Sequence, residues 1–103
     1  MTIENRPELQ EETLIEEELK EPPKYKVLLH NDDYTTMDFV VDILMRVFHK
    51  SKEEAVAIML NVHKKGVGVC GIYPAEIAET KVTLVHKMAR KKGFPLKCTM
   101  EKD

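Results

Sequence analysis

Three apolar stripes with helical spacing limit the folds open to this 103-residue chain. Within each stripe the apolar residues recur three or four positions apart, which places them on one face of an α-helix. The stripes are Met37, Val40, Val41, Leu44, Val47 and Phe48; then Ala55, Ile58, Met59 and Val62; and finally Ala78, Val82, Val85 and Ala89. The sequence therefore predicts three amphipathic helices, each of which must bury one face.

Short runs typical of strands lie before, between and after these stripes. Val27-Leu28-Leu29 precedes the first stripe, a glycine-punctuated run at 67–73 precedes the third, and Leu96, Cys98 and Met100 alternate near the end. The predicted order is β-α-α-β-α-β. Three strands and three amphipathic helices are expected to form an α+β two-layer sandwich, in which a three-stranded antiparallel sheet packs against the three helices.

Residues that favour helix ends mark the expected boundaries. Thr35 followed by Asp38 is an approximate capping box for the first helix. This helix is not expected to run far past Lys50, because Ser51-Lys52-Glu53-Glu54 is a second and better box. The other signals are Gly66 as a left-handed terminator of the second helix, Pro74 in the first turn of the third, and Gly93 at its end.

Charge is distributed unevenly along the chain. Residues 1–23 carry eight acidic and two basic side chains, whereas residues 24–103 carry ten acidic and fourteen basic ones, so a segment of −6 precedes a body of +4. Many glutamates, no aromatic residue and a closing Pro22-Pro23 leave the first segment poorly equipped to bury itself. We therefore expect a flexible acidic extension over 1–23 and a single core domain over 24–103.

The first residues and the cysteines bear on the compartment. No signal peptide or membrane segment is expected, because the first residues are charged and no apolar run is long enough to span a bilayer. A cytoplasmic location is therefore predicted. Cys70 and Cys98 lie in short apolar runs and are placed where they can be neighbours on adjacent strands. A stable disulfide is disfavoured in the cytosol, so both are expected to pack as small apolar side chains.

A polar segment, His30-Asn31-Asp32-Asp33-Tyr34-Thr35-Thr36, joins the first strand to the first helix. Alternate side chains of an extended segment share a face, so Asn31 and Asp33 are expected to point together and Asp32 the other way. His63 ends the apolar stripe of the second helix and can reach the same cavity. An amide oxygen, a carboxylate and a neutral imidazole beside an apolar slot suit a cation such as an α-amino group.

Simpler interpretations of these residues stay open. Asn-Asp-Asp before a helix is often only a turn and a cap, and a histidine ending an apolar helix face is usually a satisfied boundary residue. A metal site from His30, Asp32, Asp33 and His63 is conceivable, but a tight ligand spacing such as HExxH or CxxC is missing. Neither a nucleophile in a catalytic setting nor a phosphate loop is recognisable, so we expect no enzyme, no metal and no cofactor.

A second functional class starts from the basic body of the chain. The stretch His86-Lys87-Met88-Ala89-Arg90-Lys91-Lys92 can contact phosphates, and the order of elements is similar to that of the C-terminal domain of a ribosomal stalk protein. The alternative function is therefore a ribosome- or nucleic-acid-associated binding module. However, a helix C-terminus favours cations in any case, which explains most of the basic stretch without nucleic acid.

Five blocks of sequence resemble the ClpS adaptors, which deliver N-degron substrates to a Clp-type AAA+ unfoldase and its protease. The blocks are Asn31-Asp32-Asp33-Tyr34-Thr35-Thr36-Met37, Val62-His63-Lys64-Lys65-Gly66, Val69-Cys70-Gly71, Ala75-Glu76-Ile77-Ala78-Glu79-Thr80-Lys81 and Pro95-Leu96-Lys97-Cys98. Each block alone has modest specificity, but all five occur in family order across residues 24–102. The resemblance implies a small adaptor without catalytic activity and without nucleic-acid or membrane partners.

The resemblance also assigns residues to a pocket for the first residue of proteins that begin with Leu, Phe, Tyr or Trp. Asn31, Asp33 and His63, with Asp32 as a further participant, match the family's α-amino contacts. The residues that match the side-chain pocket are Thr35, Met37, Val40, Met59, Val62 and Leu96, and Met37 corresponds to the gatekeeper that disfavours β-branched first residues.

Further positions match contacts with the unfoldase. Glu76 and Lys81 correspond to residues that contact its N-terminal domain, of ClpA or ClpC type, and the acidic extension is implied to engage the unfoldase during substrate transfer. Two positions depart from the family pattern. Thr36 stands where many members have proline, and Phe94 replaces a residue that is often histidine before Pro95-Leu96. Neither is an amine contact, so the departures bear on the pocket rim.

Overall fold

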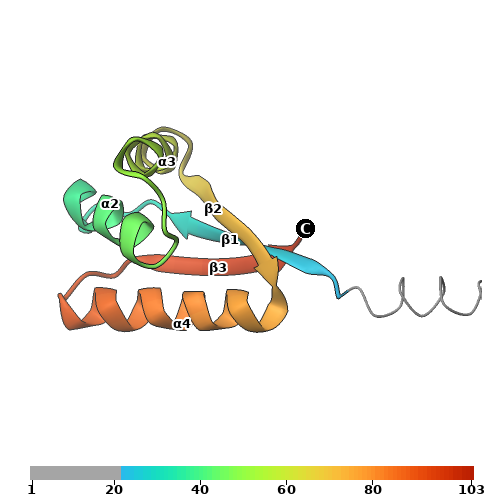
Figure 1. The fold of residues 1–103 in the computed structure, drawn as a ribbon. Helices are drawn as coiled ribbons and strands as arrows, with labels where there is room; N and C mark the ends of the chain where they lie inside the picture. The colour runs from blue at the N-terminus through green and yellow to red at the C-terminus, as the bar shows by residue number, and fades with distance from the viewer. Residues whose placement is uncertain (1–21) are drawn as a thin grey trace, which may run out of the picture.

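The structure, a computed structural model, describes residues 22–103 and has the predicted order of elements (Figure 1). These elements are β1 (Lys24–His30), α2 (Met37–Arg46), α3 (Lys52–Lys65), β2 (Val67–Pro74), α4 (Ala75–Lys91) and β3 (Lys97–Lys102). The predicted α+β class and β-α-α-β-α-β order are confirmed. The extension expected over 1–23 lies, as far as residue 21, outside the described residues, so its flexibility stays a prediction.

The three strands form one antiparallel sheet in the order β2-β1-β3, so the first strand of the chain is the central one. Since β1 separates the other two strands, the expectation that Cys70 and Cys98 are neighbours on adjacent strands is wrong. Both are buried free thiols. Burial raises the pKa of each thiol, that of Cys98 to about 12, so both pack as small apolar side chains, as predicted.

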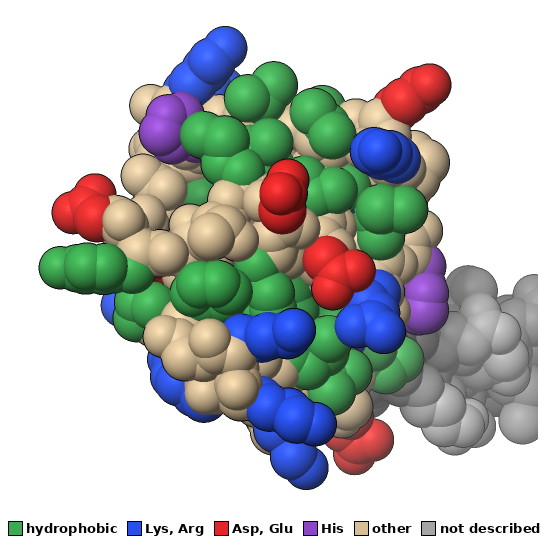
Figure 2. All heavy atoms as spheres, turned by 90° about the vertical axis from the view of Figure 1, so that its left-hand side faces the viewer, with side chains coloured by type: hydrophobic (Ala, Val, Ile, Leu, Met, Phe, Trp, Pro, Cys, Tyr) green, Lys and Arg blue, Asp and Glu red, His purple; other side chains and the backbone are tan. Residues whose placement is uncertain are grey.

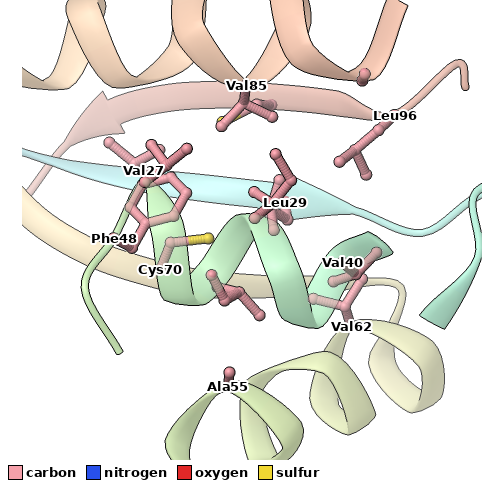
Figure 3. Close-up of a cluster of buried hydrophobic side chains, with 14 of the residues drawn as sticks. Val27, Leu29, Val40, Phe48, Ala55, Val62, Cys70, Val85 and Leu96 are labelled. Atoms are coloured by element: carbon pink, nitrogen blue, oxygen red, sulfur yellow. The ribbon is translucent and has the colours of Figure 1, made fainter. Parts of the chain in front are cut away.

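The core lies between one face of the sheet and the apolar faces of α2 and α4 (Figure 3). Val27 and Leu29 of β1 and Val85 of α4 are completely buried. Burial of a large aliphatic side chain contributes about 1.5 to 3 kcal/mol, so each of these positions contributes to the stability of the domain. α3 adds a smaller contact through Ala55 and Val62, both buried.

The first helix begins at a different cap from the one predicted, and it ends within the predicted limit near Lys50. Its N-cap is Thr36, not Thr35: Thr36 has an extended backbone, and its Oγ1 accepts a hydrogen bond from the backbone N–H of Phe39 at 3.2 Å. α2 ends at Arg46, although the stripe residues Val47 and Phe48 remain buried in the turn that follows.

The other helix ends largely follow the sequence signals. Ser51 and Glu54 form the predicted reciprocal capping box at the start of α3, and Gly66 ends this helix with φ of 88°, in the left-handed region. Pro74 lies immediately before the first turn of α4, one position earlier than predicted. Within residues 22–103, none of the helices combines the length and apolarity needed to cross a membrane.

Candidate functional site

A hollow of about 420 Å³ opens where the segment after β1 meets α2 and α3, and we call it the loop pocket. Nine of the ten residues predicted for the amine and side-chain contacts line it. The full lining is Asn31, Asp32, Asp33, Tyr34, Thr35, Thr36, Met37, Val40, Met59, Val62 and His63. The structure therefore brings together residues that lie up to 32 positions apart in the chain.

A backbone hydrogen bond ties the two walls of the loop pocket together. The N–H of Asn31, just after β1, donates to the carbonyl oxygen of Gly66 at 2.9 Å. His63 lies in the last turn of α3, only three residues before Gly66. The bond thus fixes the start of the polar segment beside the end of α3, which carries the imidazole.

Asp32 organises the polar segment from within. Its Oδ1 accepts hydrogen bonds from the backbone N–H groups of Tyr34 at 2.8 Å and Thr35 at 2.7 Å, and its Oδ2 accepts from the Thr35 hydroxyl at 2.7 Å. Partial burial of the carboxylate alone would raise its pKa, but these donors outweigh burial and the pKa of Asp32 is lowered. Asp32 therefore fixes the shape of the loop, and both of its carboxylate oxygens already accept hydrogen bonds from it.

The remaining polar groups of the loop pocket are free for a ligand. Asn31, Asp33 and His63 are exposed, and within residues 22–103 the side-chain hydrogen bonds of this loop converge on Asp32 and involve none of these three side chains. An amide, a carboxylate and an imidazole thus line one hollow, and no side-chain hydrogen bond to residues 22–103 competes for them.

Apolar side chains form the rest of the wall. Val40 and Val62 are buried, Met59 is half-buried, and Met37 is 47% exposed and so lies at the rim. Tyr34 also lines the hollow, yet it is 76% exposed. Tyr34 and Thr36 are absent from the residues predicted for the pocket, although their place in the polar segment was a signal that could have included them.

Leu96 is the predicted pocket residue that does not line the hollow. It is only 1% exposed and belongs to the buried core together with Val40 and Val62. Nearby, Phe94 packs against Phe39 of α2 with ring centroids 4.9 Å apart. Phe94 is the residue that stands where the family pattern led us to expect histidine.

A second hollow, of about 480 Å³, lies along the first half of α4, and we call it the helix hollow. It is lined by Arg46, Val47, His49, Glu76, Ile77, Thr80, Lys81 and Leu84. Glu76 is exposed, whereas Lys81 is half-buried and its side chain is hydrogen-bonded within the domain. The Nζ of Lys81 donates to the carbonyl oxygen of Val47 at 2.7 Å and lies 5.0 Å from the Tyr73 ring centroid.

The basic end of α4 is partly used by the fold itself. Figure 2 shows the left-hand end of Figure 1, with Lys and Arg side chains gathered toward its lower part and apolar and acidic side chains mixed above them. Arg90 donates to the carbonyl oxygens of Phe94 and Leu96, both at 2.9 Å. Its guanidinium therefore holds the segment between α4 and β3, which leaves less of the basic stretch free for phosphates.

The groups considered for a metal site do not assemble into one. Within residues 22–103, no three His, Cys, Asp or Glu side chains come together in a way that would hold a metal ion. His30 is instead hydrogen-bonded through Nε2 to the Thr99 hydroxyl at 2.7 Å on the sheet.

Comparison with known proteins identifies relatives over most of the chain. Residues 20–99 match the family model described as "ATP-dependent Clp protease adaptor protein ClpS". The ClpS adapter protein of Oleidesulfovibrio alaskensis is 64% identical over 90 residues, which cover 87% of this chain and 86% of that protein. The ClpS adapter protein of Desulforapulum autotrophicum is 59% identical over 101 residues, covering 96% and 97%.

A solved structure gives a spatial match as well. Agrobacterium tumefaciens ClpS2 bound to L-phenylalaninamide superimposes with a TM-score of 0.77 at 38% identity, covering 80% of this chain and 99% of that one. Both the sequence and the arrangement of elements thus relate the chain to the same group of proteins.

Proposed function

The chain belongs to the ClpS family of Clp protease adaptors, and we propose that its loop pocket binds proteins by a free α-amino group and a bulky apolar first residue. The observation that carries the assignment to this pocket is the set of three free polar side chains, Asn31, Asp33 and His63, beside an apolar wall. The bound protein is then delivered to a Clp-type unfoldase.

The polar half of the pocket fits the three N–H donors of an α-ammonium group. Asn31 offers an amide oxygen, Asp33 a carboxylate and His63 a ring nitrogen. Hydrogen bonds to a charged group contribute about 1.5 to 3 kcal/mol each, and an ammonium leaves water only when it is paired in this way. Asp32 acts through the loop, since its oxygens accept from Tyr34 and Thr35.

The apolar half takes the first side chain. Met37, Val40, Met59 and Val62 line it together with Thr35, whereas Leu96 lies in the buried core and does not line the hollow. Support comes from the relative that binds L-phenylalaninamide, a ligand with a free α-amino group and one aromatic side chain. Leu, Phe, Tyr and Trp are the first residues of matching size and polarity.

The helix hollow is the proposed contact with the N-terminal domain of the unfoldase, of ClpA or ClpC type. Exposed Glu76 and the apolar Ile77 and Leu84 provide its free surface, and Lys81 holds its floor to Val47. The protein thus acts in the cytoplasm as an adaptor that performs no chemical step, with neither nucleic acid nor a membrane as its partner.

A calorimetric titration with paired peptides tests the pocket assignment. A short peptide beginning with Phe or Leu should bind, whereas the same peptide acetylated at its N-terminus should not, since acetylation removes the positive charge and two donors. A third peptide that keeps the free amine but begins with Gly measures the polar half alone, so its difference from the Phe peptide gives the contribution of the apolar half. Equal affinity for the free and acetylated peptides would refute amine capture.

A further inference from the structure

The face of the sheet opposite the core carries a small, partly exposed apolar patch on β1 and β2. Alternate strand residues point to opposite faces, so Leu28 points away from the side that buries Val27 and Leu29. Across the β1–β2 pair, Leu28 lies opposite Val69, which is 45% exposed, and Val67 follows at 38%. This apolar column therefore continues over two strands without being buried by the described residues.

A groove runs between this face and α3, and we call it the outer groove. Its volume is about 280 Å³, and it is lined by Leu28, Asn61, Lys65, Val67, Gly68 and Val69. Gly68 allows α3 to pack closely against β2, because a Cβ there would lie 2.7 Å from Cγ2 of Val62. α3 thus forms one tight wall, and the two strands form the other.

Lysines flank the outer groove at the end nearest α3. Lys65 lines it directly, and Lys97 lies on the same face of β3, paired across the strands with His30. The exposed carboxylates Glu101 and Asp103 lie at the opposite end of the sheet, where Asp103 pairs with Lys26 at 3.9 Å. The apolar groove is therefore bordered by positive charge at one end.

We propose that the outer groove binds residues 1–21 of the same chain. This segment carries eight acidic and two basic side chains, and its apolar residues Leu9, Leu14, Ile15 and Leu19 are interspersed among glutamates. An acidic segment with spaced apolar side chains complements an apolar groove beside lysines. A second copy of the core at this face would instead place lysines against lysines, which disfavours it.

Covalent attachment makes even a weak contact effective. The segment joins the domain at Lys24, the first residue of β1, which runs beneath the groove as far as His30. A chain of this length spans up to about 70 Å when extended, more than enough to turn back along a strand. Short tethers give effective concentrations on the order of millimolar, so docking competes with any outside partner of the acidic segment.

Paramagnetic broadening in the full-length protein tests the proposal. A nitroxide is attached at Thr13→Cys; Cys70 and Cys98 are buried and react poorly. At low salt, the amide signals of Val67 and Val69 should lose roughly half their intensity, while those around Leu84 on α4 stay sharp. Salt on the order of 1 M should restore part of the lost signal.

Two variants and one mixing experiment decide the outcome. Val69→Glu should abolish the broadening, and Leu84→Glu, an equal change at an equally exposed site on α4, should preserve it. The proposal is wrong if broadening is absent, if it covers both faces alike, or if Val69→Glu leaves it unchanged. It is also wrong if labelled chains broaden the groove signals of unlabelled chains in a mixture, since the occupant would then come from a second copy.

Discussion

The loop pocket and the helix hollow differ in how their polar side chains are used. In the loop pocket Asp32 takes up the internal hydrogen bonds, which leaves Asn31, Asp33 and His63 free. In the helix hollow the conspicuous cation, Lys81, is itself an internal donor to the Val47 carbonyl. The proposed amine site thus keeps its acceptors available for a ligand, whereas in the proposed unfoldase contact the lysine stabilises the fold of its own surface.

The largest predicted effect comes from removing one of the free polar side chains of the loop pocket. Asp33→Ala and His63→Ala should each weaken binding of a Phe-initial peptide by about 10- to 150-fold, because each removes a hydrogen bond to a charged amine worth about 1.5 to 3 kcal/mol. Both side chains are exposed and unpaired within the described chain, so thermal unfolding should barely change.

Lys64→Ala is the control for these two variants. Lys64 neighbours His63 on α3 and is equally exposed, yet it does not line the loop pocket. Its removal should leave affinity unchanged. If Lys64→Ala weakened binding as much as His63→Ala, a general disturbance of the end of α3 rather than a lost imidazole contact would explain the reduced affinity.

The opposite behaviour is expected at the helix hollow. Lys81→Met should lower the free energy of unfolding by about 2 kcal/mol, because it removes a charged donor from the Val47 carbonyl and a cation from the Phe48 and Tyr73 rings. Peptide affinity at the loop pocket should not change. Chemical denaturation and calorimetry on the same variant measure the two quantities.

Lys87→Met supplies the matched comparison on the same helix. Lys87 is exposed on α4 and is not one of the residues that line the helix hollow, so this variant should unfold like the parent protein. Similar stability of both variants and the parent would mean that Lys81 is free in solution, and the contrast between the two regions would disappear.

The convergence of Asn31, Asp33 and His63 could be predicted because two independent patterns meet there. Alternation along an extended segment predicts that Asn31 and Asp33 share a face, and helical periodicity carries the stripe of α3 to His63. The structure brings all three to one hollow, but β1 ends at His30 and Asp32, expected to point the other way, lines the same hollow. The choice between Thr35 and Thr36 as helix cap could not be made locally, since both are good caps. It is decided by Asp32, whose carboxylate takes the Thr35 hydroxyl and leaves Thr36 to α2.

The order of the strands in the sheet could not be predicted from periodicity, for a similar reason. The alternation of Cys98 and Met100 identifies a strand but not its neighbour, because pairing depends on how α4 crosses the sheet. The structure puts β1 in the centre, which separates Cys98 from Cys70. By residue type, Leu96 suits a pocket wall and a buried core equally well. Only the packing shows that it belongs to the core.

Asp32→Ala tests whether ligand binding by Asn31, Asp33 and His63 depends on the hydrogen bonds that Asp32 accepts within the loop. The lowered pKa of Asp32 means that its ionised form stabilises the fold: the contribution is complete above the unfolded carboxyl's pKa of about 3.9 and is lost as pH falls through the folded-state pKa. At neutral pH the variant should lose about 1 kcal/mol of stability and several-fold in peptide affinity. Asp33→Ala should lose affinity without that stability, which separates a positioning role from a direct contact.

The smallest effect is expected at His86, whose imidazole is also hydrogen-bonded within the domain. Its Nε2 accepts a hydrogen bond from the backbone N–H of Cys98 at 2.9 Å, so the ring is neutral and carries its proton on Nδ1. Partial burial and nearby Arg90 lower the pKa of His86. Its stabilising contribution is therefore complete above the unfolded imidazole's pKa of about 6.5 and is lost as pH falls through the folded-state pKa.

Two substitutions at His86 separate the hydrogen bond from the titration. His86→Leu should cost about 1 kcal/mol at neutral pH, because the Cys98 amide loses its acceptor. His86→Gln keeps an acceptor that does not titrate, so it should match the parent at neutral pH and lose less stability on acidification, with a remainder from His30, whose pKa is also lowered by burial and by Lys97. Denaturation midpoints at several pH values measure both. Parallel acid profiles for His86→Gln and the parent would show that His86 does not titrate with folding, which would contradict the neutral, hydrogen-bonded state assigned to its ring.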